Sequence, residues 1–507
     1  MKRVVIIGGG ITGLAAAHRI IERKQQGAKQ VEVTLLEASA QLGGIIQTRQ
    51  RDGFLLERGP DSFISEKPEA LELAKRLGLE SRLIETNKNY RRSFIVRRGR
   101  LLPVPEGFHL LAPARLWPFL RSPIFSWPGK ARMALDLILP RRDRNGDADE
   151  SLAQFVRRRL GREALERMGQ PMVGGIYTAD PEQLSLLATM PRFLEMERRH
   201  RSLIRALRKA GVGSTGQSQT AREGPRIEKG TSGARYNLFL SFDRGMQVLS
   251  EKLSERIADF DSRISDGHHP PQSSIRLSTA VESLALKRDT TATAEAPQWI
   301  IKTDRNETLM ADSLCLALPA YISAKLLREF DNALAHELDE ISYASSATVN
   351  LAYKREDIPH LLDGFGFVVP FIEKRTLMAC TFSSVKFANR APDGCALLRG
   401  FVGGALQPEL LDLTEAELIS RVRADLRDLL GIERPPLFTE VSRWDRSMPQ
   451  YHLGHLARLQ RIAACVARLP ALTLAGNAFS GTGIPDCIRS GEAAADTILA
   501  FLLPILS

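Results

Sequence analysis

Cysteine is scarce in this 507-residue chain, and the few cysteines form no metal or disulfide pattern. The five are scattered and no two are spaced as Cys-x-x-Cys; they are Cys315, Cys380, Cys395, Cys465 and Cys487. A disulfide framework uses an even set at short spacings, and a cysteine-rich zinc site uses Cys-x-x-Cys pairs. The pattern therefore predicts reduced, mostly buried thiols in a reducing compartment.

Long apolar runs are also missing. No stretch reaches the roughly 18–20 uninterrupted apolar residues that a membrane-spanning helix needs. The first strand pattern begins at Lys2, with no leader pattern before it. We therefore expect a cytoplasmic protein that is either soluble or peripheral at a membrane.

Acidic residues are outnumbered, which leaves a net charge of +11. That balance suits an acidic ligand, anionic lipid or nucleic acid, and it equally suits a solvated basic surface. No nucleic-acid-binding motif accompanies the charge, so we expect no nucleic acid partner. His452 and His455 have the spacing of a metal pair but no third ligand nearby, so we predict no metal site.

The first glycines of the chain carry the strongest positive signal. Residues 2–7 form a short apolar run that opens into Gly8, Gly10 and Gly13, which match G-x-G-x-x-G. This fingerprint marks a strand that turns into a helix whose N-terminus receives a pyrophosphate. A second apolar run, 31–36, ends at Glu37, an acid placed to hold an unphosphorylated ribose. The pattern predicts an NAD or FAD site.

A second glycine-rich stretch favours FAD over NAD. It lies just past the acid and contains Gly43, Gly44 and Gly59. A nicotinamide dehydrogenase does not need such a stretch there, whereas a tightly held flavin must be buried along more of the chain. Near the C-terminus, the apolar run 471–475 leads into Gly476, Gly483 and Ile484 and then into a helical pattern. We expect both ends of the chain to meet on one cofactor.

The middle of the chain divides into helical and strand-like parts. Helical patterns occupy 150–210, and strand-like runs at 274–287, 299–303, 313–318, 347–353 and 364–369 predict one antiparallel sheet. Residues 211–235 predict a flexible insertion. Residues 105–140 carry aromatic side chains that fit either a surface for membrane or lipophilic substrate, or the core of an inserted helical domain. These aromatics are Phe108, Trp117, Phe119, Phe125 and Trp127.

Several motifs together resemble the FAD-dependent amine oxidase-like superfamily. Within it, the chain is similar to the oxygen-dependent porphyrinogen oxidases of haem biosynthesis, which act on coproporphyrinogen III or protoporphyrinogen IX. The segments that carry the resemblance are 4–18, 35–39, 42–48, 53–63, 174–191, 444–455 and 476–491. The narrowest are the Tyr-x-x-Gly-His element ending at His455 and the Gly-Ile-Pro-Asp-Cys turn ending at Cys487.

The resemblance implies an α/β fold, α+β overall. A Rossmann-like FAD domain would comprise 1–60, 236–300 and 440–507, and a mixed-sheet substrate domain 61–104 and 301–439. A helical domain that touches membrane in relatives would span 105–210, followed by the insertion at 211–235. The implied FAD contacts are Gly8, Gly10, Gly13, Glu37, Gly43, Gly44, Gly59, Val281, Gly476, Gly483 and Ile484. FAD would be non-covalent despite Cys487, and His455 would support the flavin.

The implied reaction removes six electrons from a porphyrinogen. The flavin N5 would accept a hydride three times and molecular oxygen would restore the flavin, releasing hydrogen peroxide. No protein base is demanded, so we assign no catalytic side chain; the protein orients the substrate and excludes water. Lys67, Arg92 and Arg97 are the candidate cations for substrate propionates. Ile176, Phe365 and Phe367 are the candidate apolar contacts.

The sequence leaves several readings open. The cation-rich stretch 91–100 slightly favours the tetracarboxylate coproporphyrinogen III, whereas the aromatic segment argues for the more apolar protoporphyrinogen IX. A flavin amine oxidase or a carotenoid-type desaturase is the enzymatic alternative, although a positive net charge disfavours a cationic substrate. A non-catalytic flavin-binding protein is the alternative of another class. The sequence sets no oligomeric state.

Overall fold

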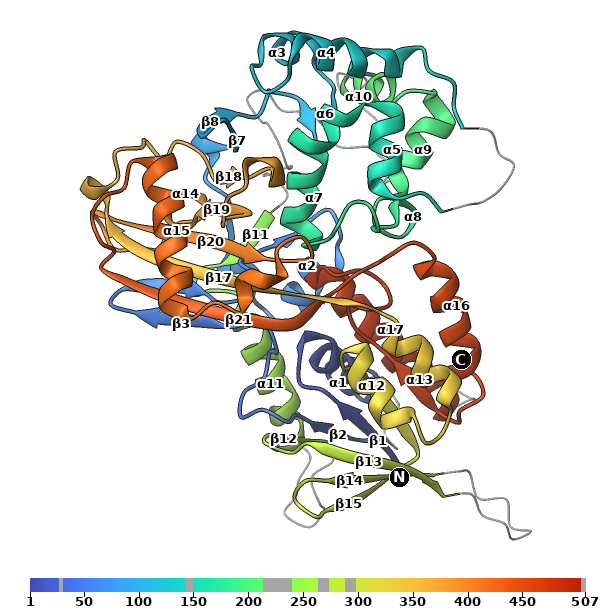
Figure 1. Ribbon diagram of the computed structural model, residues 1–507. Coiled ribbons are helices and arrows are strands. Elements are labelled where there is room, and N and C mark those ends of the chain that lie inside the picture. The colour runs from blue at the N-terminus through green and yellow to red at the C-terminus, as the bar shows by residue number, and fades with distance from the viewer. Residues whose placement is uncertain (27–30, 143–148, 213–238, 263–272, 288–297, 503–507) are drawn as a thin grey trace.

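The computed structural model describes residues 1–26, 31–142, 149–212, 239–262, 273–287 and 298–502. The predicted insertion at 211–235 lies almost wholly outside these ranges. Three layers are visible in Figure 1: a five-stranded sheet with its helices at the bottom, a seven-stranded sheet at the left, and a group of helices at the top. The predicted mixture of helices and sheets with a Rossmann-like unit is confirmed.

The five-stranded sheet has the order β12-β2-β1-β16-β22, and every pair in it is parallel. One face is covered by α1, α11 and α17, and the other by α12, α13 and a small antiparallel sheet, β13-β14-β15. Burial on both faces suits the continuous apolar runs Val4–Ile7 of β1 and Leu314–Leu316 of β16, which pair in the interior of the sheet. The strands are β1 (Lys2–Ile7), β2 (Val31–Leu36), β12 (Ser273–Arg276), β13 (Val281–Lys287), β14 (Gln298–Thr303), β15 (Thr308–Ala311), β16 (Ser313–Leu316) and β22 (Leu472–Leu474).

The helices of this layer pack closely against the sheet and against one another. Helix α1 (Ile11–Gln25) starts within the fingerprint, directly after Gly10, and is buried along most of its length. Helix α17 (Ile484–Leu502) packs against α1, where a Cβ at Gly491 would lie 2.1 Å from the Thr12 carbonyl oxygen. The others are α2 (Glu69–Arg76), α11 (Gln247–Ser262), α12 (Ala320–Leu327), α13 (Asn332–Asp339) and α16 (His455–Val466).

The prediction of one antiparallel sheet for the middle of the chain is wrong. Strands β12 and β16 join the parallel sheet beside β2 and β1, and β13 and β14 belong to the small antiparallel sheet. Only the runs at 347–353 and 364–369 enter the seven-stranded sheet. A short apolar run fits a parallel or an antiparallel partner equally well, so the pattern could not choose between them.

The seven-stranded sheet has the order β21-β17-β20-β19-β18-β7-β8 and is mixed, because β18 and β7 run parallel. Helix α15 (Glu415–Leu430) covers one face; it starts with a capping box from Thr414 and Glu417 and ends at Gly431. The strands are β7 (Phe94–Arg97), β8 (Arg100–Pro103), β17 (Tyr343–Lys354), β18 (Gly366–Val368), β19 (Ala379–Phe382), β20 (Cys395–Gly403) and β21 (Phe438–Pro449).

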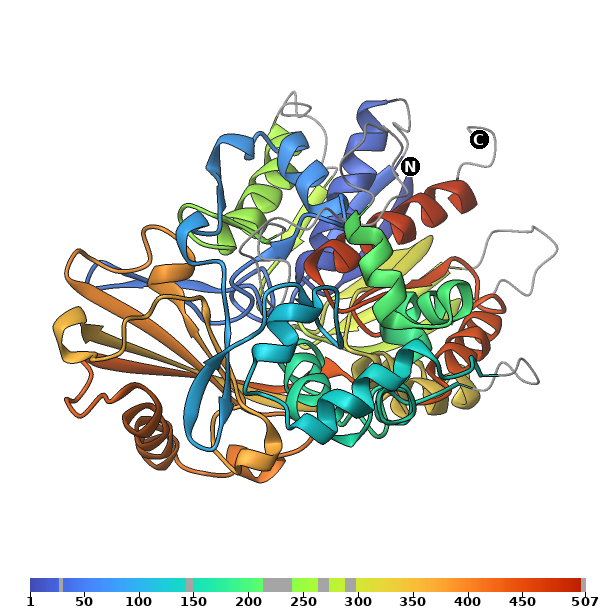
Figure 2. The same ribbon diagram turned by 90° about the horizontal axis from the view of Figure 1, so that it is seen from above.

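The helices α3 to α10 form a third group, which we call the helical layer. Figures 1 and 2 show it beside the seven-stranded sheet, and Figure 1 shows it at the opposite end of the molecule from the five-stranded sheet. A fully buried ion pair between Arg159 and Asp136 braces it, and the Asp136 carboxylate also accepts the Ser202 hydroxyl at 2.6 Å. The helices are α3 (Leu116–Arg121), α4 (Trp127–Ala134), α5 (Leu152–Arg159), α6 (Arg162–Ala164), α7 (Gln170–Tyr177), α8 (Leu186–Thr189), α9 (Pro191–His200) and α10 (Leu203–Val212).

The aromatic side chains of residues 105–140 divide between the core of the helical layer and its surface. Phe108, Phe119 and Phe125 pack on one another in the core of the helical layer. Trp117 and Trp127 are instead 63% and 70% exposed. No helix in the described parts of the chain is long and apolar enough to cross a bilayer.

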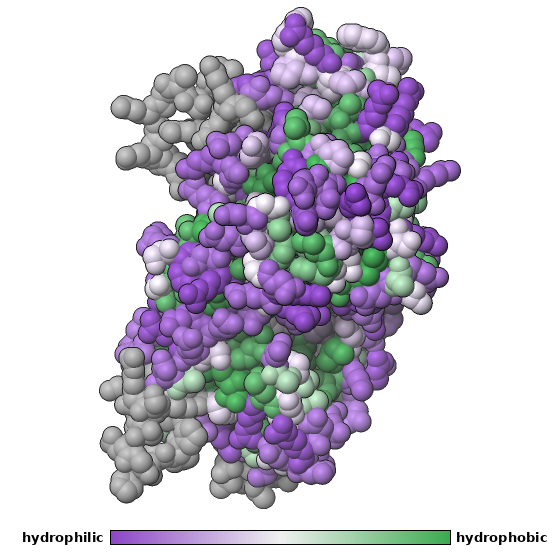
Figure 3. All heavy atoms as spheres, turned by 90° about the vertical axis from the view of Figure 1, so that its left-hand side faces the viewer, coloured by the Kyte–Doolittle hydropathy of each residue, from purple (hydrophilic) through white to green (hydrophobic). Residues whose placement is uncertain are grey.

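Short elements complete the fold. The ribbon of β3 (Thr48–Arg51) and β4 (Phe54–Glu57) packs against the seven-stranded sheet through Phe54 and Leu56. Figure 3 shows one face of the molecule, on which hydrophilic side chains predominate and apolar patches lie between them. The remaining elements are β5 (Phe63–Ile64), β6 (Leu83–Glu85), β11 (Phe239–Phe242), β9 (Phe108–His109), β10 (Ala112–Pro113) and α14 (Ser383–Lys386).

Candidate active site

The carboxyl ends of four parallel strands meet at one edge of the five-stranded sheet. The Gly8 N–H donates to the Leu36 carbonyl at 2.8 Å, and the Ala317 N–H donates to the Ile7 carbonyl at 2.8 Å. The Ala475 N–H continues the ladder to the Leu316 carbonyl at 3.0 Å. The first and last glycine motifs, more than 400 residues apart, therefore share the edge at which open α/β sheets bind ligands.

The fingerprint glycines are close-packed except where a ligand would lie. A Cβ at Gly13 would lie 1.9 Å from the Gly8 carbonyl oxygen, and one at Gly8 would lie 2.4 Å from the Ala317 carbonyl oxygen. A Cβ at Gly10 would meet nothing within 4 Å. Helix α1 has no capping side chain and no acidic residue in its first turn. The loop therefore leaves space and uncapped N–H groups for a pyrophosphate.

Glu37 is held against this loop. Its Oε2 accepts the Gly9 N–H at 2.6 Å and its Oε1 accepts the Ser39 N–H at 2.8 Å. The remaining lone pairs of the carboxylate are suited to ribose hydroxyls. The Thr279 N–H donates to the Glu37 carbonyl at 2.9 Å, which brings the start of β13, and with it Val281, beside the acid.

The second glycine stretch lies directly on the first. Gly43 forms a bridge with Gly10 and donates its N–H to the Gly9 carbonyl at 2.9 Å. A Cβ at Gly44 would lie 3.4 Å from the Gly10 Cα. A Cβ at Gly59 would lie 1.7 Å from the Ile45 carbonyl oxygen, so only glycine fits there. The predicted contacts Gly8, Gly10, Gly43 and Gly44 are thus brought together.

The turn at Gly59 is gripped by side chains that the sequence analysis did not identify. Thr348 Oγ1 and Trp444 Nε1 donate to the Arg58 carbonyl at 3.0 and 2.9 Å. Asn350 Nδ2 donates to the Glu57 carbonyl at 3.3 Å, and Arg399 donates to the Gly59 carbonyl. All four belong to the seven-stranded sheet, on the face opposite α15. In the sequence, Thr348 and Asn350 alternate with apolar neighbours, and this alternation could have indicated a polar face on the strand.

Glu57 is a buried carboxyl in the same turn. It accepts the Met246 N–H at 2.8 Å and the Thr48 hydroxyl at 2.8 Å. Burial raises the pKa of Glu57 to about 7, against the opposing effect of these hydrogen bonds and of Arg390 and Arg399. The carboxyl therefore titrates close to neutral pH.

The C-terminal turn approaches the same edge. Gly476 has a φ of +138° and donates its N–H to Ser490 Oγ at 3.0 Å. Gly483 directly precedes α17, and Ile484 is the first residue of that helix. Because α1 and α17 pack together closely, the N-termini of both helices face the same space. The structure thus brings the predicted N-terminal and C-terminal contacts to one site.

The three predicted cations have different surroundings. The Lys67 ammonium pairs with Asp486 Oδ2 at 2.5 Å, and Arg92 pairs with Asp363. Arg97 ends β7, and its buried Nε has no hydrogen-bond partner among the described residues. Burial, with the neighbouring Arg167, lowers the pKa of Arg97. Among the described residues, Arg97 is the one of these three cations that has a buried donor without a partner.

Two of the predicted apolar contacts, Ile176 and Phe367, lie on opposite sides of the seven-stranded sheet. Ile176, on α7, is 43% exposed. Phe365 is buried, and Phe367 is buried in the core between the sheet and α15. The neighbouring Val368 packs on the helical layer instead. This placement counts against Phe367 as the cover of a substrate ring, because successive strand residues point to opposite faces.

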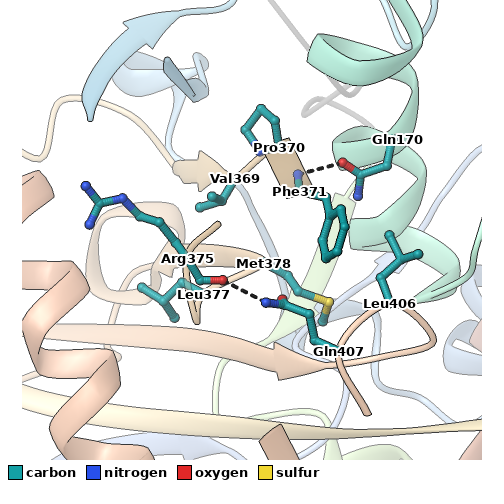
Figure 4. Close-up of a pocket in the computed structure, with 9 residues that line it drawn as sticks. All are labelled: Gln170, Val369, Pro370, Phe371, Arg375, Leu377, Met378, Leu406 and Gln407. Atoms are coloured by element: carbon teal, nitrogen blue, oxygen red, sulfur yellow. Dashed lines mark hydrogen bonds between the residues drawn. The ribbon is translucent and has the colours of Figure 1, made fainter. Parts of the chain in front are cut away.

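Two hollows occur in the described parts of the molecule. The one in Figure 4 separates α7 from the sheet; Gln170 Oε1 accepts the Phe371 N–H at 2.9 Å and Gln407 Nε2 donates to the Arg375 carbonyl at 2.9 Å. The other lies along residues 50–55, 243–244 and 389. Neither is lined by a predicted site residue. Within the described ranges, no group of three metal-ligating side chains occurs.

Known proteins resemble this chain over its whole length. The family model described as flavin containing amine oxidoreductase matches residues 11–499. Coproporphyrinogen III oxidase of Bacillus subtilis is 35% identical over 502 residues, which are 99% of this chain and 98% of that protein. The chloroplastic protoporphyrinogen oxidase of Nicotiana tabacum is 31% identical over 98% of this chain and 85% of its own length.

Solved structures agree with the fold. A crystal structure from Exiguobacterium sp. 255-15, provisionally assigned as a protoporphyrinogen oxidase, has a TM-score of 0.80 and 30% identity, with 98% of both chains covered. Cyclohexylamine oxidase from Brevibacterium oxydans IH-35A has a TM-score of 0.66 at 17% identity, with 99% of both chains covered. The second likeness shows the fold alone.

Proposed function

Because the chain belongs to the flavin containing amine oxidoreductase family, we propose that it is a porphyrinogen oxidase of haem biosynthesis that converts coproporphyrinogen III to coproporphyrin III. The protein is an oxidoreductase with FAD as its cofactor. The observation that carries the substrate assignment is the 35% identity to a coproporphyrinogen III oxidase over 99% of this chain.

The described residues fit FAD. The open space at Gly10 and the uncapped start of α1 suit the pyrophosphate, and Glu37 suits the ribose. We propose that Val281 contacts the adenine and that the turn from Gly476 to Ile484 contacts the flavin end. When bound, the flavin supplies hydride acceptance and reaction with molecular oxygen. We propose that it is held non-covalently.

The chain's own task is to hold the substrate against this edge and to exclude water. The face of the seven-stranded sheet opposite α15 carries Ile95 and Val368 toward the helical layer. A porphyrinogen between that face and α7 would meet apolar side chains. Arg97 then offers an unsatisfied donor for a propionate, and Lys67 can exchange Asp486 for a second one.

The substrate assignment is tested by steady-state turnover of coproporphyrinogen III and protoporphyrinogen IX under air. We expect the higher kcat/KM with coproporphyrinogen III. In Arg97→Gln, KM for coproporphyrinogen III should rise about tenfold, because one charge-assisted hydrogen bond is lost. The control is Arg100→Gln, an exposed arginine opposite Arg97 in the same hairpin. Turnover of protoporphyrinogen IX alone would overturn the assignment, and turnover of neither would overturn the function.

We also propose molecular oxygen as the electron acceptor and hydrogen peroxide as the second product. Six electrons leave the porphyrinogen, so three molecules of oxygen should be consumed and three of peroxide released for each porphyrin. An oxygen electrode with a peroxide assay measures both. Porphyrin formation without oxygen uptake would show that another acceptor is used.

The exposed tryptophans of the helical layer support peripheral contact with the cytoplasmic face of an anionic membrane. The exposed Arg121 lies 4.6 Å from the ring of Trp117. Ile138 nearby is 75% exposed. Tryptophan beside a cation is typical of a membrane interface. We expect co-sedimentation with phosphatidylglycerol vesicles, weakened in Trp117→Gln/Trp127→Gln; equal partition of both proteins would contradict the contact.

A further inference from the structure

Tyr451 joins two parts of the molecule that are far apart in the sequence. It follows β21 and is 4% exposed. Its hydroxyl accepts the Gly481 N–H at 2.9 Å and donates to the Asn477 carbonyl. Both partners belong to the turn that leads from β22 into α17. One phenol therefore closes this turn from the side.

The turn needs such a clamp because its backbone is unusual. Gly476 and Gly481 have φ values of +138° and +118°, which side chains rarely allow. Such conformations persist only where the surroundings hold them. The phenol hydroxyl satisfies one N–H and one carbonyl group of the turn. Without it, these two backbone groups would lose a hydrogen bond in a largely buried place.

His455 packs against the ring of Tyr451. Its ring stacks on that of Tyr451 at 4.1 Å between centroids and 12° between planes. The ring is 3% exposed, and the backbone of Ala478, in the same turn, offers it a hydrogen bond. Burial, with Arg458, lowers the pKa of His455 to about 4, so the ring is neutral at neutral pH.

The same segment is fastened to the helical layer. The Ser185 N–H donates to the Tyr451 carbonyl at 2.8 Å, and the Leu453 N–H donates to the Gln183 carbonyl at 2.9 Å. Asp149 accepts the Ser185 hydroxyl at 2.8 Å and the Gly454 N–H at 3.0 Å. Residues 451–454 therefore form a strap between the helical layer and the C-terminal turn.

We propose that Tyr451 is a positioning residue for the flavin: its hydroxyl holds the turn 476–483 in the shape that receives the cofactor, with His455 fixing the phenol. The proposal rests on the family's flavin and not on the identity of the substrate. A failure of the porphyrinogen assay would therefore leave it intact.

The test is the binding of FAD to the apoprotein of Tyr451→Phe. Binding is measured by the quenching of flavin fluorescence and by visible circular dichroism. The variant keeps the ring and its stacking and removes only the hydroxyl. We expect affinity for FAD to fall about tenfold and the visible spectrum of the bound flavin to change, because two backbone groups of the turn lose their partner. Thermal unfolding of the apoprotein reports on general stability.

Tyr353→Phe is the matched control. Tyr353 is 1% exposed, and its hydroxyl meets Arg423 in the core beneath α15. The Tyr353→Phe variant should be less stable than the wild type, without a change in its affinity for FAD or in the visible spectrum of the bound flavin. Wild-type affinity and spectrum in Tyr451→Phe would overturn the proposal, as would an equal loss of affinity in both variants. If the Tyr451→Phe apoprotein does not fold, His455→Gln decides: several-fold weaker FAD binding supports the proposal, and unchanged binding overturns it.

Discussion

Glu57 should make the protein less stable as the pH rises from acid to neutral. The carboxyl is buried, and its pKa is raised from 4.5 to about 7 in the folded state. The folded protein therefore keeps a proton that the unfolded chain has already released, and stability falls between pH 4.5 and 7. The difference in pKa corresponds to roughly 3 kcal/mol of unfolding free energy.

Glu57→Gln isolates this effect. The amide keeps the contacts, since its oxygen can accept the Met246 N–H and its nitrogen can donate to Thr48 Oγ1. We expect the variant to be more stable than the wild type at pH 8 and to lose most of that advantage at pH 4.5. Urea unfolding of the apoprotein across this range measures the difference, with the exposed Glu282→Gln as control. A difference between Glu57→Gln and wild type that does not change with pH would refute the reasoning.

Two further predictions concern helix α1, which contains the fingerprint residue Gly13. Gly13→Ala should abolish FAD binding and lower the melting temperature, because its Cβ would meet the Gly8 carbonyl oxygen at 1.9 Å; Gly175→Ala, whose Cβ meets nothing within 4 Å, is the control, and FAD retention in Gly13→Ala would contradict the prediction. Burial, with Arg76, lowers the pKa of His18 to about 4. The unfolded chain therefore binds a proton before the folded protein does, and the free energy of unfolding should fall by up to roughly 3 kcal/mol between pH 6.5 and 4. In His18→Gln this acid-side loss should disappear when urea midpoints are compared, and an unchanged loss would show that other groups cause it.

The parts that could be predicted from the sequence are those whose cause is local. The fingerprint Gly8, Gly10 and Gly13 follows β1 directly, so strand, turn and helix are all specified within a few residues. Glu37 ends the next strand, and parallel pairing of neighbouring strands places it at the same edge. The same holds for the hairpin of β7 and β8, which turns at Gly99.

The parts that could not be predicted depend on pairing between distant segments. Thr348 reaches the Arg58 carbonyl across 290 residues, and Lys67 meets Asp486 across 419. Phe367 was assigned to the substrate, but strand register sends it toward α15. A one-residue change of register exchanges the two faces of a strand, and a short apolar run does not specify that register.

The domain boundaries predicted from the sequence and the FAD contacts of individual residues remain predictions. The predicted FAD contacts depend most directly on the shared edge of the five-stranded sheet, because α1 and α17 both begin there. A structure of the protein with bound FAD would assign each contact.

The measurement that most directly tests the central claim is anaerobic mixing of the FAD-loaded protein with coproporphyrinogen III in a stopped-flow spectrophotometer. We expect the porphyrinogen to bleach the flavin absorbance rapidly, and coproporphyrin fluorescence to continue to rise when air is admitted. A flavin that dithionite reduces but that neither coproporphyrinogen III nor protoporphyrinogen IX bleaches would contradict the account.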